Sequence, residues 1–352
     1  MRCMFRRNGA KGNYAYTVTR VKAKKSQLLV EEDYNKMLMM TVPEISRYIS
    51  ESGYSKEMTE LASRLSGIDL LEHATYANMA KIFSSILSAS SGELYDMISA
   101  YLTKWDIWNL KVILRGKSYG LSADGIREDL VPAGRLSAES LDKLVAFDSE
   151  DDVIANFSKM AHINFPQEVL AAYKASENLG ELEDFLDRFH YERLEGSISP
   201  ASMPTRLFRD YVRKEIDVKN FETILKLKFE GISGDVVMKY MISGGKDMDS
   251  KLITLMAMAE TVDEVLTEAA DLPFYEEIKG SWDTSTIRGI ITGLKKYEIS
   301  QSDKFSHMYP LSVVPVIDYM IHKEIEVNNI RAVARGTESG LDRDTIKGLL
   351  VI

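Results

Sequence analysis

Side chains that could bind a metal ion or activate a nucleophile are few in this chain, and their spacing builds no recognisable site. The five histidines include no pair four residues apart, and the single cysteine, Cys3, cannot supply a zinc cluster or an internal disulfide. Gly244-Gly245-Lys246 lacks the leading glycine and the hydroxyl residue of a phosphate-binding loop, and we interpret it as a turn. We therefore expect no catalytic residue, no cofactor and no metal site.

The acidic pair Asp151-Asp152 resembles half of a metal-binding motif, but it belongs to a capping pattern that occurs three times. In each copy a hydroxyl residue is followed three residues later by a carboxylate and then by a β-branched residue, beginning at Thr41, Ser149 and Thr261. Such a hydroxyl accepts a hydrogen bond from a first-turn N–H, and the carboxylate suits the helix dipole. We interpret the acids as caps. This disfavours the alternative of a helical enzyme that binds Mg²⁺ and a phosphorylated substrate.

A second pattern also occurs three times and consists of an asparagine followed six residues later by a basic residue. The asparagines are Asn109, Asn220 and Asn329, and the basic residues are Arg115, Lys226 and Arg335. A helical asparagine at a repeated position usually satisfies backbone groups of a neighbouring loop. A cation near a helix C-terminus complements the dipole and can bond the last carbonyls. We expect all six positions to be structural, with binding of a common ligand by the three asparagines as the alternative.

The two patterns keep the same order and nearly the same interval, which indicates that the chain is triplicated. Successive asparagines are 111 and 109 residues apart, and each follows its capping hydroxyl by 68, 71 or 68 residues. Helical periodicity dominates, and the helices that carry the asparagines should run about 20–25 residues. Gly120, Gly231 and Gly340 should end them in the left-handed conformation. We predict an all-α protein with a basic leader and the start of the first helix at 1–25, followed by helical repeats at 26–135, 136–247 and 248–352.

Charge is unevenly distributed along the chain. Residues 1–25 carry +8 of a total of −9, so residues 26–352 carry −17. An acidic body argues against nucleic-acid binding. The basic start could lie near anionic headgroups or an acidic partner, or could simply be a solvated helix face. No apolar run approaches the roughly 20 residues that span a bilayer, so we expect any membrane association to be peripheral or through a partner.

The third repeat carries the most specific resemblance to a known family. Residues 309–317, Tyr-Pro-Leu-Ser-Val-Val-Pro-Val-Ile, together with residues 323–331 and Ala334-Arg335-Gly336, resemble the C-terminal signature of the C subunit of archaeal A-type ATP synthases. That protein is equivalent to the d subunit of eukaryotic V-type ATPases. Further matching stretches are Tyr14-Ala15-Tyr16, Asn109-Leu110-Lys111 and Leu186-Asp187-Arg188-Phe189. The resemblance covers residues 13–352. It departs at Leu227, where the other two repeats have glycine, and residues 1–12 look like an extension.

The resemblance implies a fold and a function. It implies three similar helical domains around a pseudo-threefold axis, arranged as a funnel without a catalytic site. It further implies a central-stalk coupler that receives the rotor shaft and sits peripherally on the membrane proteolipid ring, at the cytoplasmic side of the cell membrane. Its partners would be the shaft subunits, the ring and other ATP synthase subunits. Its role would be to couple ATP synthesis to proton or sodium transport.

The ring-contact surface is predicted from three loops that occupy one equivalent place in the repeats. These loops are Ser88–Gly92, Ser197–Pro204 and Tyr309–Pro315. The alternative function is a pseudo-threefold helical scaffold or regulatory adaptor unrelated to any rotary ATPase. Composition and repeats fit both functions equally, so only the family signature separates them.

Overall fold

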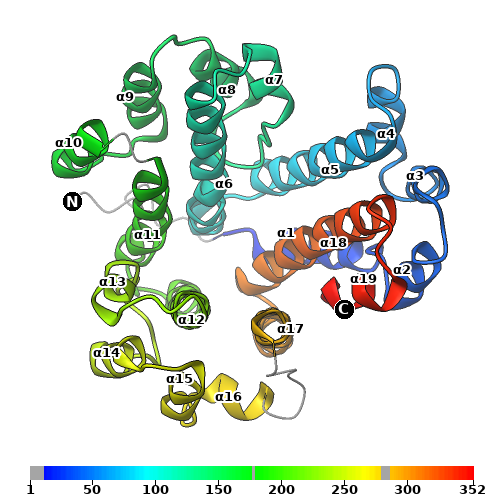
Figure 1. The fold of residues 1–352 in the computed structure, drawn as a ribbon. Helices are drawn as coiled ribbons and strands as arrows, with labels where there is room; N and C mark the ends of the chain where they lie inside the picture. The colour runs from blue at the N-terminus through cyan, green and yellow to red at the C-terminus, as the bar shows by residue number, and fades with distance from the viewer. Residues whose placement is uncertain (1–11, 177–178, 279–285) are drawn as a thin grey trace. The chain divides into compact units, whose positions relative to one another are not determined.

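The structure is a computed structural model that describes residues 12–176, 179–278 and 286–352. These residues form 19 α-helices and no β-strand, which confirms the all-helical prediction (Figure 1). None of the helices in the described ranges is long and apolar enough to cross a membrane.

The helices follow one order in all three predicted repeats: three shorter helices, two long ones and a short one. A basic helix, α1 (Tyr14–Lys25), precedes them. The helices of the first repeat are α2 (Glu31–Met37), α3 (Val42–Ser50), α4 (Ser55–Leu61), α5 (Gly67–Ala89), α6 (Gly92–Ser118) and α7 (Ala123–Glu128). Those of the second are α8 (Ala138–Val145), α9 (Glu150–Ala161), α10 (Gln167–Ser176), α11 (Leu179–Ser197), α12 (Met203–Phe229) and α13 (Gly234–Lys239). Those of the third are α14 (Ser250–Met258), α15 (Val262–Glu268), α16 (Pro273–Ile278), α17 (Ile287–Met308), α18 (Val314–Glu338) and α19 (Arg343–Leu349).

The repeated hydroxyl residues precede helices as predicted, and the hydroxyls of Ser149 and Thr261, but not that of Thr41, accept a first-turn N–H. Thr41 precedes α3, and its backbone N–H donates to the Glu44 carboxylate at 2.8 Å. Ser149 Oγ accepts from the Asp152 N–H at 3.1 Å at the start of α9. Thr261 Oγ1 accepts from the Glu264 N–H at 3.2 Å at the start of α15. The acidic residues at these positions therefore stabilise first turns.

The glycines that were predicted to end the asparagine-bearing helices also do so. Gly120, Gly231 and Gly340 have φ of 67°, 74° and 69°, a left-handed conformation that side-chain-bearing residues rarely adopt. In each case the next residue's N–H reaches back to the carbonyl five residues earlier, for example Leu121 to Gly116 at 2.8 Å. This is the 6→1 bond that closes a helix end in a Schellman motif.

The described residues pack as two compact units, which we treat separately. In one, residues 187–318, α12 and α13 share a core with α14, α15, α16 and α17. Phe221 and Ile224 of α12 are fully buried there, as is Val265 of α15. This core combines the end of the second repeat with the start of the third.

The other unit contains residues 12–186 and 319–350, and it joins the two ends of the chain. One of its cores is formed by α2, α3, α4 and α5 together with α18 and α19. Ile45 and Ile49 of α3 are fully buried with Ile330 and Val333 of α18. The long helix of the third repeat therefore packs against the first helices of the chain, just as α12 packs against α14 and α15.

Candidate functional site: the carboxylate clamps of the long helices

A buried carboxylate on α6 holds the loop that leads into the second repeat. Asp106, which is 1% exposed, accepts hydrogen bonds from the N–H groups of Arg135 at 3.1 Å and Leu136 at 2.9 Å. A Cβ on Gly134 would lie 2.1 Å from the Asp106 carboxylate, so only glycine fits beside it. The clamp fixes the loop directly before α8.

Asp217 on α12 makes the same clamp in the other compact unit. It accepts from the N–H groups of Lys246, Asp247 and Met248 at 2.9, 2.7 and 3.1 Å. Gly245 repeats the role of Gly134, because a Cβ there would lie 2.1 Å from the carboxylate. Gly244-Gly245-Lys246 therefore lies in the loop before α14. Burial raises the pKa of Asp217, and the three amides oppose that shift.

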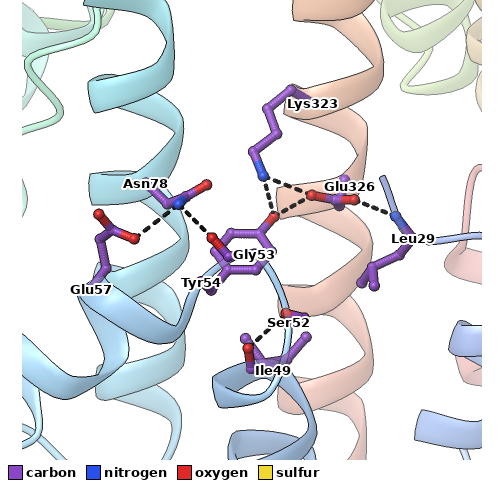
Figure 2. Close-up of polar contacts among 9 residues, drawn as sticks. All are labelled: Leu29, Ile49, Ser52, Gly53, Tyr54, Glu57, Asn78, Lys323 and Glu326. Atoms are coloured by element: carbon purple, nitrogen blue, oxygen red, sulfur yellow. Dashed lines mark hydrogen bonds and ion pairs between the residues drawn. The ribbon is translucent and has the colours of Figure 1, made fainter. Parts of the chain in front are cut away.

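The third clamp uses Glu326 on α18, and its loop comes from the start of the chain. The Leu29 N–H donates to Glu326 Oε2 at 2.6 Å (Figure 2). Leu29 lies two residues before α2, as Leu136 and Met248 lie two residues before α8 and α14. The N-terminal segment thus takes the place that a fourth repeat would fill. The third loop has Ser26-Gln27 where the other two loops have glycine, so its backbone cannot approach the helix as closely. The longer side chain of glutamate is consistent with that greater distance.

Glu326 differs from its counterparts because a buried cation and a tyrosine accompany it (Figure 2). Lys323 Nζ donates to Glu326 Oε1 at 2.7 Å and to the Tyr54 hydroxyl at 2.8 Å. The Tyr54 hydroxyl donates to Glu326 Oε1 at 2.5 Å. Burial lowers the pKa of Lys323 and the Glu326 charge counteracts it, so the two charges depend on each other.

The repeated asparagines bind loop backbone, as predicted, in the first two copies. Asn109 donates to the Val131 carbonyl at 2.7 Å and accepts from the Val131 N–H at 2.8 Å. Asn220 makes the same pair of bonds with Ile242, both at 2.8 Å. Asn329 is also buried, and it hydrogen-bonds the Tyr34 hydroxyl of α2. Each asparagine lies three residues, or about one helical turn, after the clamp carboxylate of its own helix.

The repeated basic residues lie in the last turns of their helices, but the partners that the structure shows are carboxylates rather than the expected helix-end carbonyls. Arg115 pairs with Glu183 of α11, and Arg335 pairs with Glu72 of α5. Lys226 pairs instead with Glu222 at 2.7 Å, four residues back on its own helix. The reason is visible in the sequence, since residues 287–293 at the start of α17 contain no acid. Two of the three cations therefore join separate helices.

The predicted ring-contact segments are shorter as loops than the sequence suggested. The connections between the long helices are residues 90–91, 198–202 and 309–313, so Ser88 and Ser197 lie in the last turns of α5 and α11. Gly92, Pro204 and Pro315 lie in first turns, where a proline has no N–H to satisfy. Gly92 has φ of 59°, which turns the chain from α5 into α6. Met203, Met308 and Leu311 leave exposed apolar surface at or beside two of these connections.

Two details of the long helices went unrecognised at the level of sequence. Residues 116–120, Gly-Lys-Ser-Tyr-Gly, match the Gly-x-Ser-x-Gly spacing of a nucleophile elbow. An elbow needs a strand-to-helix turn, whereas this segment is the C-terminal end of α6, so the match has no catalytic geometry. The Leu227 departure is explained by packing. A Cβ on Gly116 or Gly336 would collide with Ile126 or Ile346, the residue ten positions further on. In the second repeat the residue ten positions after Leu227 is Val237, which is smaller than isoleucine.

Comparison with known proteins identifies the family of this chain. Residues 17–349 match the family model described as ATP synthase (C/AC39) subunit. The chain belongs to this family. The A-type ATP synthase C subunit of Methanococcoides burtonii is 36% identical over 350 residues, covering 99% of this chain and 96% of the relative. The C subunits of Methanosarcina mazei and Halobacterium salinarum are 38% and 34% identical, covering 97% of this chain and 93% and 98% of their own lengths.

Family membership settles the class of function. A C/AC39 chain is a non-catalytic part of a rotary ATPase, so this protein works together with other ATP synthase subunits and has no catalytic role by itself. The clamps are accordingly structural sites. Their chemistry is the satisfaction of buried amides by carboxylates, which fixes how the long helices join the loops.

Proposed function

We propose that this chain is the central-stalk coupler of an A-type ATP synthase. In this role it links the rotor shaft to the proteolipid ring, so that ATP turnover in the soluble head drives, or is driven by, proton or sodium movement through the membrane. The observation that carries the proposal is the family match, which extends over residues 17–349. The alternative of an unrelated adaptor has no comparable support.

The clamps suit a part that transmits torque. Such a part must keep its helices in register under load, and well-packed interiors transmit strain with little deformation. α6, α12 and α18 are each bonded through a buried carboxylate to the loop before another repeat. Because Glu326 of α18 accepts a hydrogen bond from the Leu29 N–H, α18 is bonded to the segment that precedes α2.

The proposed partners occupy different surfaces. We place the three repeats around a shared axis as a funnel that receives the shaft foot. The ring then meets the connections at 90–91, 198–202 and 309–313, within the predicted segments Ser88–Gly92, Ser197–Pro204 and Tyr309–Pro315. The chain itself stays peripheral, at the cytoplasmic side of the cell membrane.

Purified components test the assignment. The chain is mixed with purified shaft subunits, and separately with detergent-solubilised ring, and the products are analysed by size exclusion with light scattering. We expect a one-to-one complex with the shaft and a stable complex with the ring. Binding to neither component would refute the coupling role.

The ring surface is tested by insertions. A Gly-Ser-Gly-Ser segment is inserted into each of the three connections, with an insertion after the exposed Asp148 as the matched control. We expect the three insertions, but not the control, to reduce ring recovery in a pull-down while shaft binding persists. Unchanged ring recovery in all three variants would exclude these loops as the contact surface.

A further inference from the structure

The connections between the long helices lie in the three longest stretches of the chain that contain no aspartate, glutamate, lysine or arginine. These stretches are residues 82–92, 196–205 and 305–317, and every other such stretch has eight residues or fewer. Each of the three is bounded by a charged residue on both sides, in a chain in which 28% of the residues are charged. The same exclusion of charge in all three repeats indicates a shared requirement at these connections.

Several positions in these stretches are exposed and have room for a charged side chain. Ser91 is exposed in the first connection, and Ser199 and Ala201 are exposed in the second. Charged side chains are usually found at exposed positions, where water solvates them. The fold of the chain therefore does not by itself explain why charge is missing here.

The second and third connections lie at the same end of the compact unit that contains α12 and α17. Nζ of Lys214, in the first half of α12, lies 4.8 Å from the centre of the Phe305 ring near the end of α17. Phe221 lies further along α12 and Tyr297 lies earlier in α17, and the rings of both contact the ring of Phe274. The two helices therefore run in opposite directions, so the start of α12 and the end of α17 are at one end of the unit.

Exposed apolar side chains accompany the missing charge at this end, which we call the uncharged tip and which consists of residues 196–205 and 305–317. Met203 at the start of α12 is 50% exposed, and Met308 at the end of α17 is 56% exposed. Leu311, between α17 and α18, is 65% exposed. Depletion of charge and enrichment in methionine characterise the centre of a protein interface, which a polar rim surrounds. Methionine is flexible and polarizable, so it packs against surfaces of irregular shape.

We propose that the uncharged tip packs against uncharged side chains of the proteolipid ring, without ion pairs across the centre of the contact. The inference rests on the proposed function, since the ring is the partner, and it adds the chemistry of the contact. A charge placed in the centre of such a contact would lose its water without gaining a partner, which is unfavourable whatever its sign. Salt would weaken the contact little, because no attraction between opposite charges holds the two surfaces together.

The salt dependence of ring binding tests the absence of ion pairs. Binding of the full-length chain to the purified ring in lipid nanodiscs is measured in about 0.1 M and about 1 M potassium chloride, where the Debye lengths are about 10 and 3 Å. We expect Kd to rise less than about twofold at the higher concentration. A larger rise would overturn the uncharged contact and leave the coupling role intact.

Two further outcomes of the same measurement separate this proposal from the coupling role. Equal binding to nanodiscs without the ring would identify lipid as the partner of the tip and would overturn this proposal. Absence of ring binding at both salt concentrations would also overturn it. The coupling role would be overturned as well only if shaft binding were absent too.

Charges of both signs, introduced one at a time, locate the contact. Leu311→Lys and Leu311→Glu place opposite charges in the uncharged tip. The matched controls are Phe229→Lys and Phe229→Glu, at the opposite end of α12, where Phe229 is 61% exposed. We expect both changes at Leu311 to weaken ring binding at least about tenfold, or about 1.4 kcal/mol, and both controls to change it less than about twofold.

Shaft binding and thermal unfolding of the four variants should match those of the wild type, because both positions are exposed. Tighter ring binding with either charge at Leu311 would show that the ring presents the opposite charge there, and it would overturn the proposal. Unchanged ring binding in both Leu311 variants, or equal weakening by the Phe229 variants, would overturn it as well.

Discussion

The Glu326 clamp should be the one whose loss destabilises the fold most. Glu326→Gln keeps the size of the side chain but removes the negative charge beside Lys323. Lys323 and Glu326 are only 4% and 3% exposed, so water cannot replace the lost charge. Removal of one partner of a buried ion pair typically destabilises a protein by about 3–5 kcal/mol. The Leu29 N–H also loses its charged acceptor.

The two aspartate clamps provide the natural comparison. Asp106 and Asp217 hold backbone amides of their loops, whereas Glu326 holds an amide and also faces the buried cation of Lys323. Asp106→Asn should therefore cost about 1–3 kcal/mol, which is the range for weakening hydrogen bonds to a buried acceptor. We expect Glu326→Gln to be the more damaging change by about 2 kcal/mol.

Hydrogen exchange followed by mass spectrometry locates the effect. In Glu326→Gln, peptides from residues 26–37 should exchange much faster than in the wild type, whereas Asp106→Asn should expose residues 132–145. The double variant Lys323→Met/Glu326→Gln removes the unpaired cation and should recover part of the lost stability in urea unfolding. A loss below about 1 kcal/mol in Glu326→Gln, with unchanged exchange in 26–37, would refute the claim that this clamp ties the two ends of the chain together.

Three further changes test other parts of the structure. Gly336→Leu should lower the free energy of unfolding by about 1–3 kcal/mol, because a Cβ there would lie 2.7 Å from Ile346 Cγ1. Adding Ile346→Val reproduces the Leu227–Val237 pair of the second repeat and should recover part of the lost stability in thermal unfolding. Arg115→Met leaves the buried Glu183 carboxylate without its partner and should lower the free energy of unfolding in urea by about 1–3 kcal/mol. Lys226→Met removes only an ion pair within one helix and should lower it by about 0.3–0.5 kcal/mol. Burial raises the pKa of Glu298 to about 7, with Glu215 and Glu222 adding to the shift and Lys219 opposing it. The folded state therefore loses stability as the pH rises from about 4.5 through 7, so Glu298→Gln should be more stable than the wild type at pH 8 by about 1–3 kcal/mol and no more stable at pH 4.

Local features of the fold were predictable because their causes are local. A capping hydroxyl and its carboxylate lie three residues apart, and a left-handed glycine ends its own helix, so Thr41, Ser149 and Gly120 could be assigned from sequence. The repeated asparagines were also predictable, since Asn109 and Val131 are 22 residues apart within one repeat. Each of these patterns is weak evidence alone, but all of them occur three times at nearly the same spacing, which made the assignments reliable.

Features that depend on distant partners were not predictable. Glu326 binds Leu29 across 297 positions, and no periodicity in either segment indicates the other. The carboxylates that receive Arg115 and Arg335 lie on helices whose place is set by core packing, not by sequence separation. The ends of the inter-helix loops were misjudged for a different reason. Pro204 and Pro315 were assigned to loops because proline often lies there, but both lie in the first turns of helices.

The predicted triplication accounts for the packing of the last long helix against the first short helices. In residues 187–318, the end of one repeat forms a core with the beginning of the next, so a sequence repeat is not by itself a folding unit. A chain built this way leaves two unfinished surfaces, one on its last long helix and one on its first short helices. Here those surfaces cover each other, since Ile330 and Val333 of α18 pack with Ile45 and Ile49 of α3, and Glu326 holds the loop before α2. Loss of either end would expose both surfaces at once, and for this reason the buried charge pair at the closure has more influence on stability than either of the other clamps.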